Sequence, residues 1–96
     1  MLNRLELTDK RPTPHPQVAS RIVDGEALIV LADSGEVIVL NRVGSRLWEL
    51  MDGSRSVGEI VEAIVTEFDT TQEQAEQDVG AFIRELVENR MLVLHE

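Results

Sequence analysis

Residues 40–53 read LNRVGSRLWELMDG, and this stretch joins a strand-like half of the chain to a helical half. Leu40 ends an apolar alternating run, and Asn41 has a side-chain oxygen that can accept a hydrogen bond from the first free amides of a helix. Gly53 can adopt the left-handed backbone with which many helices end. Between them, apolar residues recur at helical spacing: Val43, Leu47, Leu50 and Met51. The stretch holds no catalytic combination, so it predicts an architectural junction that positions functional surfaces elsewhere.

A three-stranded meander is predicted before this junction. An Asp-Gly pair at residues 24–25 separates the apolar segments 18–23 and 26–32 and supplies the two positive-φ positions of a type I′ turn. A second turn, at residues 33–35, ends in glycine and leads into a third strand at residues 36–40. Apolar side chains of this third strand point to both faces, and its outer backbone edge lacks a partner strand.

Two capped amphipathic helices are predicted after the junction. Ser56 and Glu59 have the spacing of a capping box, in which each side chain satisfies a free amide of the other residue. The core stripe of this helix consists of Val57, Ile60, Val61, Ile64 and Phe68. The next helix is capped by Thr70 or Thr71 and runs to about Asn89.

The last helix has an apolar face that is wider than its core stripe. The stripe consists of Ala75, Val79, Phe82 and Leu86, and Ile83 and Val87 extend it to one side. These two residues line a groove on one interpretation and belong to the core on the other, and the sequence leaves both open. A short apolar segment at residues 91–94 closes the chain.

Residues 1–17 are polar and contain three prolines, which predicts a flexible N-terminal tail before a single folded domain at residues 18–96. No cysteine is present, so disulfides and Cys-ligated metal sites are excluded, and a cytoplasmic location is expected. No apolar run approaches the roughly 20 residues that span a bilayer. His15 and His95 are interpreted as solvated, and neither a metal nor another cofactor is expected.

Acidic residues outnumber basic ones by 18 to 9, which gives a net charge of −9. From Ser56 onward, ten carboxylates are opposed only by Arg84 and Arg90, so this half of the chain would repel a phosphate backbone. The sequence also lacks a histidine–carboxylate–nucleophile set and a glycine-rich phosphate loop, so a non-enzymatic binding module is predicted.

Three motifs together resemble the PqqD family of small peptide-binding proteins from the biosynthesis of peptide-derived natural products. They are the junction quoted above, SVGEIVEAIVTEF at residues 56–68 and DVGAFIRELVENRML at residues 78–92. The shared domain of that family is called the RiPP recognition element, and the resemblance covers about residues 18–94. One departure is at Asn89-Arg90, where glycine is common; asparagine also tolerates the left-handed conformation of a helix stop.

The resemblance implies an α+β, winged-helix-like fold in which a three-stranded antiparallel sheet is followed by three helices. It further implies that the leader of a ribosomally made precursor peptide adds as a strand beside the third strand and lies against the last helix. The chain would present that leader to a modifying enzyme, such as a radical SAM protein or a leader protease. Carried onto this sequence, the peptide-binding residues are Glu36, Val37, Ile38, Val39, Leu40, Ile83, Arg84 and Val87.

Two other functions compete with leader binding. A structural homodimerisation module would use the same exposed third strand to pair with or exchange its twin. A winged-helix DNA-binding protein would use the last two helices, but the acidic residues there disfavour it. Trp48 lies beside the core stripe of its helix and is interpreted as a partly buried packing residue rather than a ligand contact.

Overall fold

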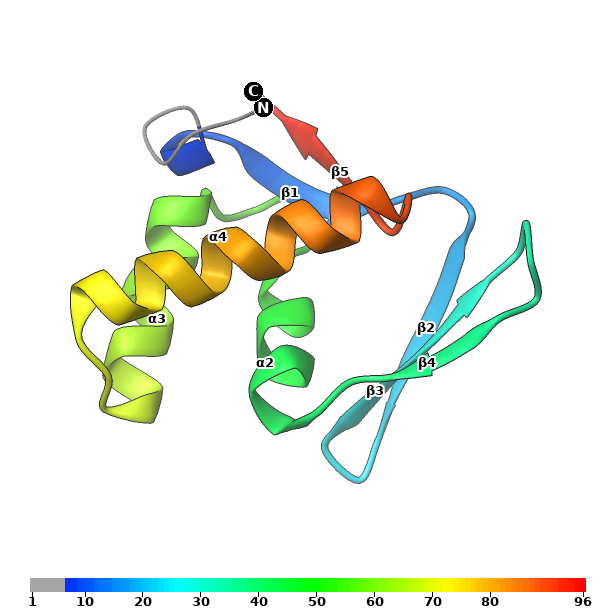
Figure 1. The fold of residues 1–96 in the computed structure, drawn as a ribbon, viewed down its shortest axis with the longest axis horizontal. Coiled ribbons are helices and arrows are strands. Elements are labelled where there is room, and N and C mark those ends of the chain that lie inside the picture. The colour runs from blue at the N-terminus through cyan, green and yellow to red at the C-terminus, as the bar shows by residue number, and fades with distance from the viewer. Residues whose placement is uncertain (1–6) are drawn as a thin grey trace.

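The computed structural model of the chain describes residues 7–96 and contains two small sheets and three helices. Figure 1 shows the three helices on one side of the molecule and the larger sheet on the other. The elements in chain order are β1 (Arg11–Pro14), β2 (Val18–Val23), β3 (Glu26–Leu31), β4 (Val37–Val39), α2 (Arg42–Leu50), α3 (Val57–Phe68), α4 (Gln72–Glu88) and β5 (Leu92–His95).

The larger sheet is antiparallel and has the order β2-β3-β4. The β2–β3 turn has positive φ at both Asp24 (51°) and Gly25 (81°), as a type I′ turn requires. In β3, Ala27, Ile29 and Leu31 are buried, whereas Val30 is exposed, so the sheet covers the core with one face only. The prediction of an α+β fold with a three-stranded antiparallel sheet followed by three helices is confirmed.

All three helices begin at the predicted caps. The Oδ1 atom of Asn41 accepts a hydrogen bond from the N–H of Gly44 at 2.8 Å, and Ser56 and Glu59 form the complete capping box. Of the two candidate threonines before α4, Thr71 is the cap. At the other end of α4 the left-handed residue is Arg90 (φ 59°) rather than Asn89, whose side chain bonds to a carbonyl within the helix.

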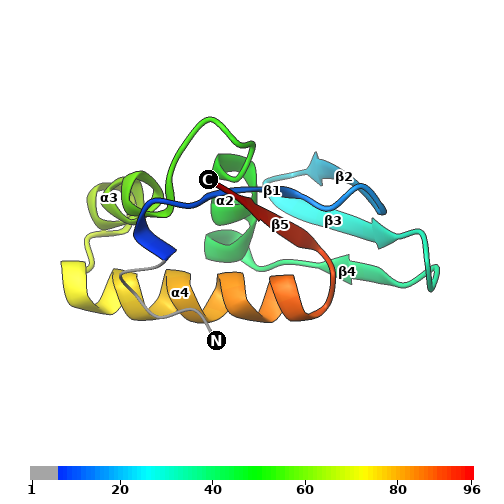
Figure 2. The same cartoon turned by 90° about the horizontal axis from the view of Figure 1, so that it is seen from above.

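A second sheet of two strands, β1 and β5, was not predicted. Sequence reasoning assigned residues 1–17 to a tail, whereas Arg11–Pro14 pair antiparallel with Leu92–His95 (Figure 2). Pro12 is among the fully buried side chains, and Leu7 is also buried. Residues 1–6 of the predicted tail lie outside the described part of the chain.

The core lies between the larger sheet and the helices and contains the predicted stripes. Trp48 is 5% exposed, and its Nε1–H donates to the Oγ atom of Ser20 at 3.0 Å, which agrees with its interpretation as a packing residue. The hydroxyl of Ser45 accepts from the N–H of Ala27 and donates to the carbonyl of Leu40, so α2 is tied to both β3 and the end of β4. Within residues 7–96, no helix is long and apolar enough to cross a membrane.

Candidate functional site

Strand β4 is an edge of the larger sheet, and the ladder fixes where its backbone groups point. The N–H of Leu31 donates to the carbonyl of Glu36 at 2.9 Å, and the N–H of Leu40 donates to the carbonyl of Ala27 at 3.0 Å. Hydrogen-bonded pairs alternate along an antiparallel ladder, so residues 36, 38 and 40 direct their polar groups to β3. Val37 and Val39 therefore direct two N–H donors and two carbonyl acceptors outward, away from the sheet.

Apolar side chains line the α4 side of this edge. Ile38 and Leu40 lie on the core face of β4, and both are only partly buried against the core. Phe82 of α4 is also partly buried. Its ring and Leu40 both lie next to Gly44 of α2, because a Cβ atom added to this glycine would be 3.5 Å from Cε1 of Phe82 and 3.5 Å from Cβ of Leu40. The ring is therefore close to the end of β4. We call Ile38, Leu40 and Phe82 the apolar floor.

The opposite face of the same strand is exposed. Val37 and Val39 retain 60% and 55% of their accessible surface, and Val30 beside them on β3 retains 40%. A strand added to β4 would thus meet apolar side chains on both of its faces.

The three predicted residues on α4 occupy different surroundings. Ile83 is buried with 0% of its surface exposed, which favours the core over the groove, the two interpretations that the sequence left open. Arg84 lines a cavity on another flank of the helix, and Val87 follows it by three residues, which places Val87 on the same flank at 37% exposure. The flank that approaches β4 is instead marked by Phe82, which the sequence analysis placed in the core stripe.

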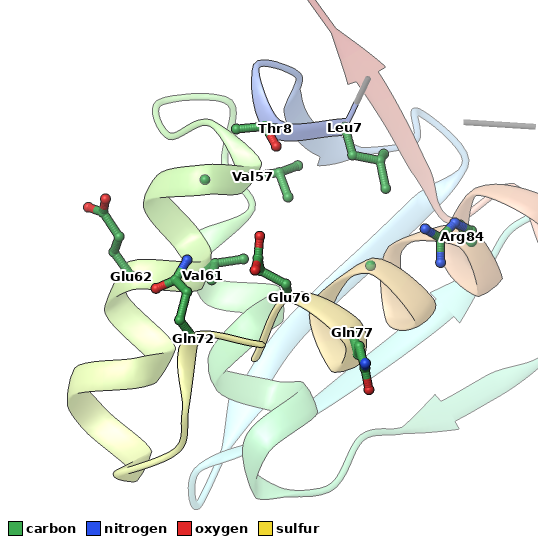
Figure 3. A pocket seen from close by; sticks show the side chains of 11 residues that line it. Leu7, Thr8, Val57, Val61, Glu62, Gln72, Glu76, Gln77 and Arg84 are labelled. Atoms are coloured by element: carbon green, nitrogen blue, oxygen red, sulfur yellow. The ribbon is translucent and has the colours of Figure 1, made fainter. Parts of the chain in front are cut away.

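The cavity beside Arg84 has a volume of about 410 Å³ and lies between α3, α4 from Gln72 to Arg84 and the segment at Leu7 (Figure 3). Val57 and Val61 form part of its apolar wall, and Glu76 and Arg84 bring opposite charges to it. None of the β4 residues lines it. Within residues 7–96, no group of three or more His, Cys, Asp or Glu side chains could hold a metal ion.

The turn between β3 and β4 is fastened to the end of α4. The guanidinium of Arg90 lies 3.4 Å from a carboxylate oxygen of Asp33, and both side chains are more than half exposed. The amide side chain of Gln17 reinforces this contact, because it donates to the carbonyl of Arg90 at 2.8 Å and accepts from the N–H of Asp33 at 3.1 Å. The position of β4 relative to α4 is therefore fixed at the start of the strand by this turn and at its end by the packing of Leu40 and Phe82 around Gly44.

The other edge of the sheet, β2, is also open over part of its length. The N–H of Ala32 donates to the carbonyl of Gln17, so by the same alternation Ser20 and Ile22 direct their backbone groups away from β3. Ile22 is 41% exposed, but the aromatic neighbour of this edge, Trp48, is buried. The β4 edge, by contrast, is flanked by partly exposed apolar side chains from two elements, β4 and α4.

Comparisons with known proteins agree with these features. A family model described as coenzyme PQQ synthesis protein D (PqqD) matches residues 26–92. The PqqA binding protein of Gluconobacter oxydans (strain 621H) is 35% identical over 57 residues, which are 59% of this chain and 59% of that protein. The match thus spans less than two thirds of the relative's length.

Two solved structures have a similar fold. The structure of TbiB1 in complex with the TbiA(beta) leader peptide gives a TM-score of 0.79 at 30% identity, over 83% of this chain and 93% of the other. The structure of lasso peptide synthetase B1 complexed with the leader peptide gives a TM-score of 0.78 at 20% identity, over 86% and 98%. At that lower identity, the second match speaks for the fold alone.

Proposed function

This chain belongs to the PqqD family, and from that premise we propose that it binds the leader of a ribosomally made precursor peptide and presents it to a modifying enzyme. The role is non-catalytic, and the enzyme would be a radical SAM protein or a leader protease. The observation that carries the proposal is the β4 edge, where the outward backbone groups of Val37 and Val39 lie beside the apolar floor. Two similar proteins whose descriptions name PqqA binding or a bound leader peptide support it.

In the proposed complex the leader forms a fourth strand of the larger sheet. Its main chain bonds to Val37 and Val39, and the leader residue opposite Ile38 points toward the apolar floor. Main-chain bonds of this kind supply affinity for any extended peptide, while the side-chain environments of the two faces supply selectivity. The site therefore comprises residues 36–40 and Phe82, with Val87 as an outer contact only if the leader passes the end of α4.

We place the peptide-binding domain at residues 18–96, with the β1 strand packed against it. A soluble cytoplasmic location is part of the same proposal. Independence from nucleic acid is also part of it, since the helical half carries a local excess of carboxylates that would repel phosphates. No cofactor takes part in leader binding.

The test is a titration of the isotope-labelled chain with the leader of a precursor peptide encoded beside it. We expect the largest amide shifts at Val37 and Val39, with aromatic shifts at Phe82. Shifts concentrated at Ser20 and Ile22, with β4 unmoved, would place the peptide on the β2 edge and refute the proposed site.

A homodimer is the second candidate, because the same open edge and the exposed Val37 and Val39 could pair with a second copy. Such a dimer would occupy the backbone groups that the leader requires. Light scattering coupled to size exclusion distinguishes the two: a dimer that dissociates when leader is added would show that both partners use β4.

A further inference from the structure

Carboxylates surround the apolar floor on both of its sides. Glu36 has the same strand parity as Ile38 and Leu40, so its side chain lies on the α4 side of β4. On α4, residues three and four positions from Phe82 share its flank, and these are Glu85 and Asp78. All three carboxylates are exposed.

Four arginines of the described chain have other neighbours than the carboxylates beside the floor. Arg46 forms a two-bond ion pair with Glu67, and Arg90 pairs with Asp33. Arg84 lines the cavity on the other flank of α4. Arg42, the basic residue closest to β4 in sequence, lines a shallow depression with Asp24 and Glu26 at the β2–β3 turn. Within residues 7–96, none of the ion pairs described above involves Glu36, Asp78 or Glu85, and Asp78 accepts a hydrogen bond from the neutral amide of Gln74 at 2.9 Å.

Glu36, Asp78 and Glu85 form what we call the acidic rim. Alone it would be a solvated surface, but here it lies beside a strand edge and the apolar floor. The outward N–H and carbonyl groups of Val37 and Val39 require an extended peptide backbone. The apolar floor favours an apolar side chain on the peptide residue opposite Ile38, which lies between the residues that bond to Val37 and Val39. The rim then disfavours a leader whose neighbouring side chains are acidic and favours one whose neighbours are basic.

We propose that the leader segment recognised at β4 is cationic: an apolar strand with Lys or Arg beside the residue that enters the floor. This inference rests on the proposed function and adds the chemical class of its ligand. The exposed carboxylates contribute modestly to affinity, and the overall charge of −9 also speeds the encounter with a basic peptide.

The experiment uses the full chain and a displayed library of random dodecapeptides, so that no leader has to be identified beforehand. We expect the enriched peptides to combine alternating apolar residues with Lys or Arg and to shift the amides of Val37 and Val39. The double variant Glu36→Gln/Glu85→Gln should bind them about fivefold more weakly, and its affinity should depend less on salt.

A matched control distinguishes the effect of the acidic rim on affinity from the effect of the net charge of the chain. Glu62→Gln/Glu73→Gln changes the net charge equally on surfaces away from β4 and should change the affinity by less than about twofold. If neutral or acidic peptides are enriched and still shift Val37 and Val39, or if both double variants behave alike, the cationic preference is refuted and leader binding at β4 stands. Enriched peptides that leave β4 unshifted, or an absence of enrichment, would refute the proposed site as well.

Discussion

The outer edges of β1 and β4 differ in how their backbone groups are used. The N–H of His15 donates to the carbonyl of Met91, so by alternation the outward positions of β1 are those of Pro12 and Pro14, which have no N–H to offer. The carbonyls of Lys10 and Pro12 accept hydrogen bonds from the N–H groups of Val57 (2.8 Å) and Gly53 (3.0 Å). The β1 edge is thus closed to a further strand.

The β4 edge has none of these protections. Its outward residues are Val37 and Val39, which keep their N–H groups, and neither proline nor lysine occurs in residues 36–40. An unprotected edge invites unwanted strand pairing, and natural proteins usually blunt it. Closure of one edge and exposure of the other in the same molecule therefore support a binding role for β4.

The largest expected effect tests whether the two sheets share one core. Leu86 is 4% exposed, and Leu86→Ala should lower the free energy of unfolding by about 2 to 5 kcal/mol, because a cavity replaces its buried side chain. Urea denaturation measures the loss. Amide hydrogen exchange should accelerate together in β5 and in β3; acceleration in only one of them would show that the sheets unfold separately.

The next prediction transfers the protection of β1 to β4. Val39→Pro removes an outward N–H and leaves the ladder to β3 intact, so leader binding should weaken tenfold or more, about 1.4 kcal/mol, as measured by calorimetry. Ile38→Pro is the control, because the N–H of Ile38 points to β3 and its loss should cost about 1 to 3 kcal/mol of stability. Unchanged leader affinity in a folded Val39→Pro chain would exclude strand addition at this edge.

A smaller effect is expected from the two α4 side chains. Phe82→Leu keeps an apolar residue but removes the aromatic ring that the floor offers to the leader, and it should weaken leader binding by about 1 kcal/mol, or fivefold. Val87→Ala should change the affinity by less than about twofold, because Val87 lies on the flank with Arg84. Both affinities can be measured by fluorescence polarisation. A larger loss for Val87→Ala than for Phe82→Leu would support the site predicted from sequence, in which Val87 contacts the leader.

Local signals explain what the sequence could predict. The caps at Asn41 and Ser56 and the turn at residues 24–25 depend on a few adjacent residues, and each is present in the structure. The pairing of β1 with β5 joins residues more than 75 positions apart, so no local signal indicates it. The prolines of β1 lack N–H groups, which is compatible with a tail and with an edge strand, and the sequence analysis predicts the tail.

The α4 side of the site could not be assigned for a related reason. Helical spacing shows that Phe82, Ile83 and Val87 are near the apolar face, but it does not show which flank meets β4. That choice depends on tertiary packing at the start of α2, where the ring of Phe82 and the side chain of Leu40 both lie close to Gly44. An aromatic residue on one helix and a glycine in the first turn of another form a signal that only the folded chain brings together.

The smallest expected effect concerns acid. The backbone N–H of Ser56 donates to Glu59 at 2.9 Å, and this hydrogen bond holds the pKa of Glu59 below its usual value. A carboxyl with a lowered pKa in the folded state stabilises the fold above its unfolded pKa, about 4.3, and loses that contribution as the pH falls through the lower, folded value. The pKa of Glu67 is lowered in the same way by its hydrogen bonds from Arg46.

The free energy of unfolding should therefore stay level from neutral pH to about pH 5 and decline below about pH 4. The ladder between β4 and β3 consists of backbone bonds that do not titrate, and the only carboxylate described as fastening its turn is the exposed Asp33, so acid should loosen the helical half before it affects the pairing of β4 with β3. Urea denaturation at a series of pH values tests the decline, and Glu59→Gln should make it shallower, since glutamine still accepts the bond from Ser56 but does not titrate. Equal slopes for the two chains would mean that the capping box contributes nothing to acid sensitivity, and loss of β4 protection before that of α3 in hydrogen exchange would reverse the order of stability argued for the two regions.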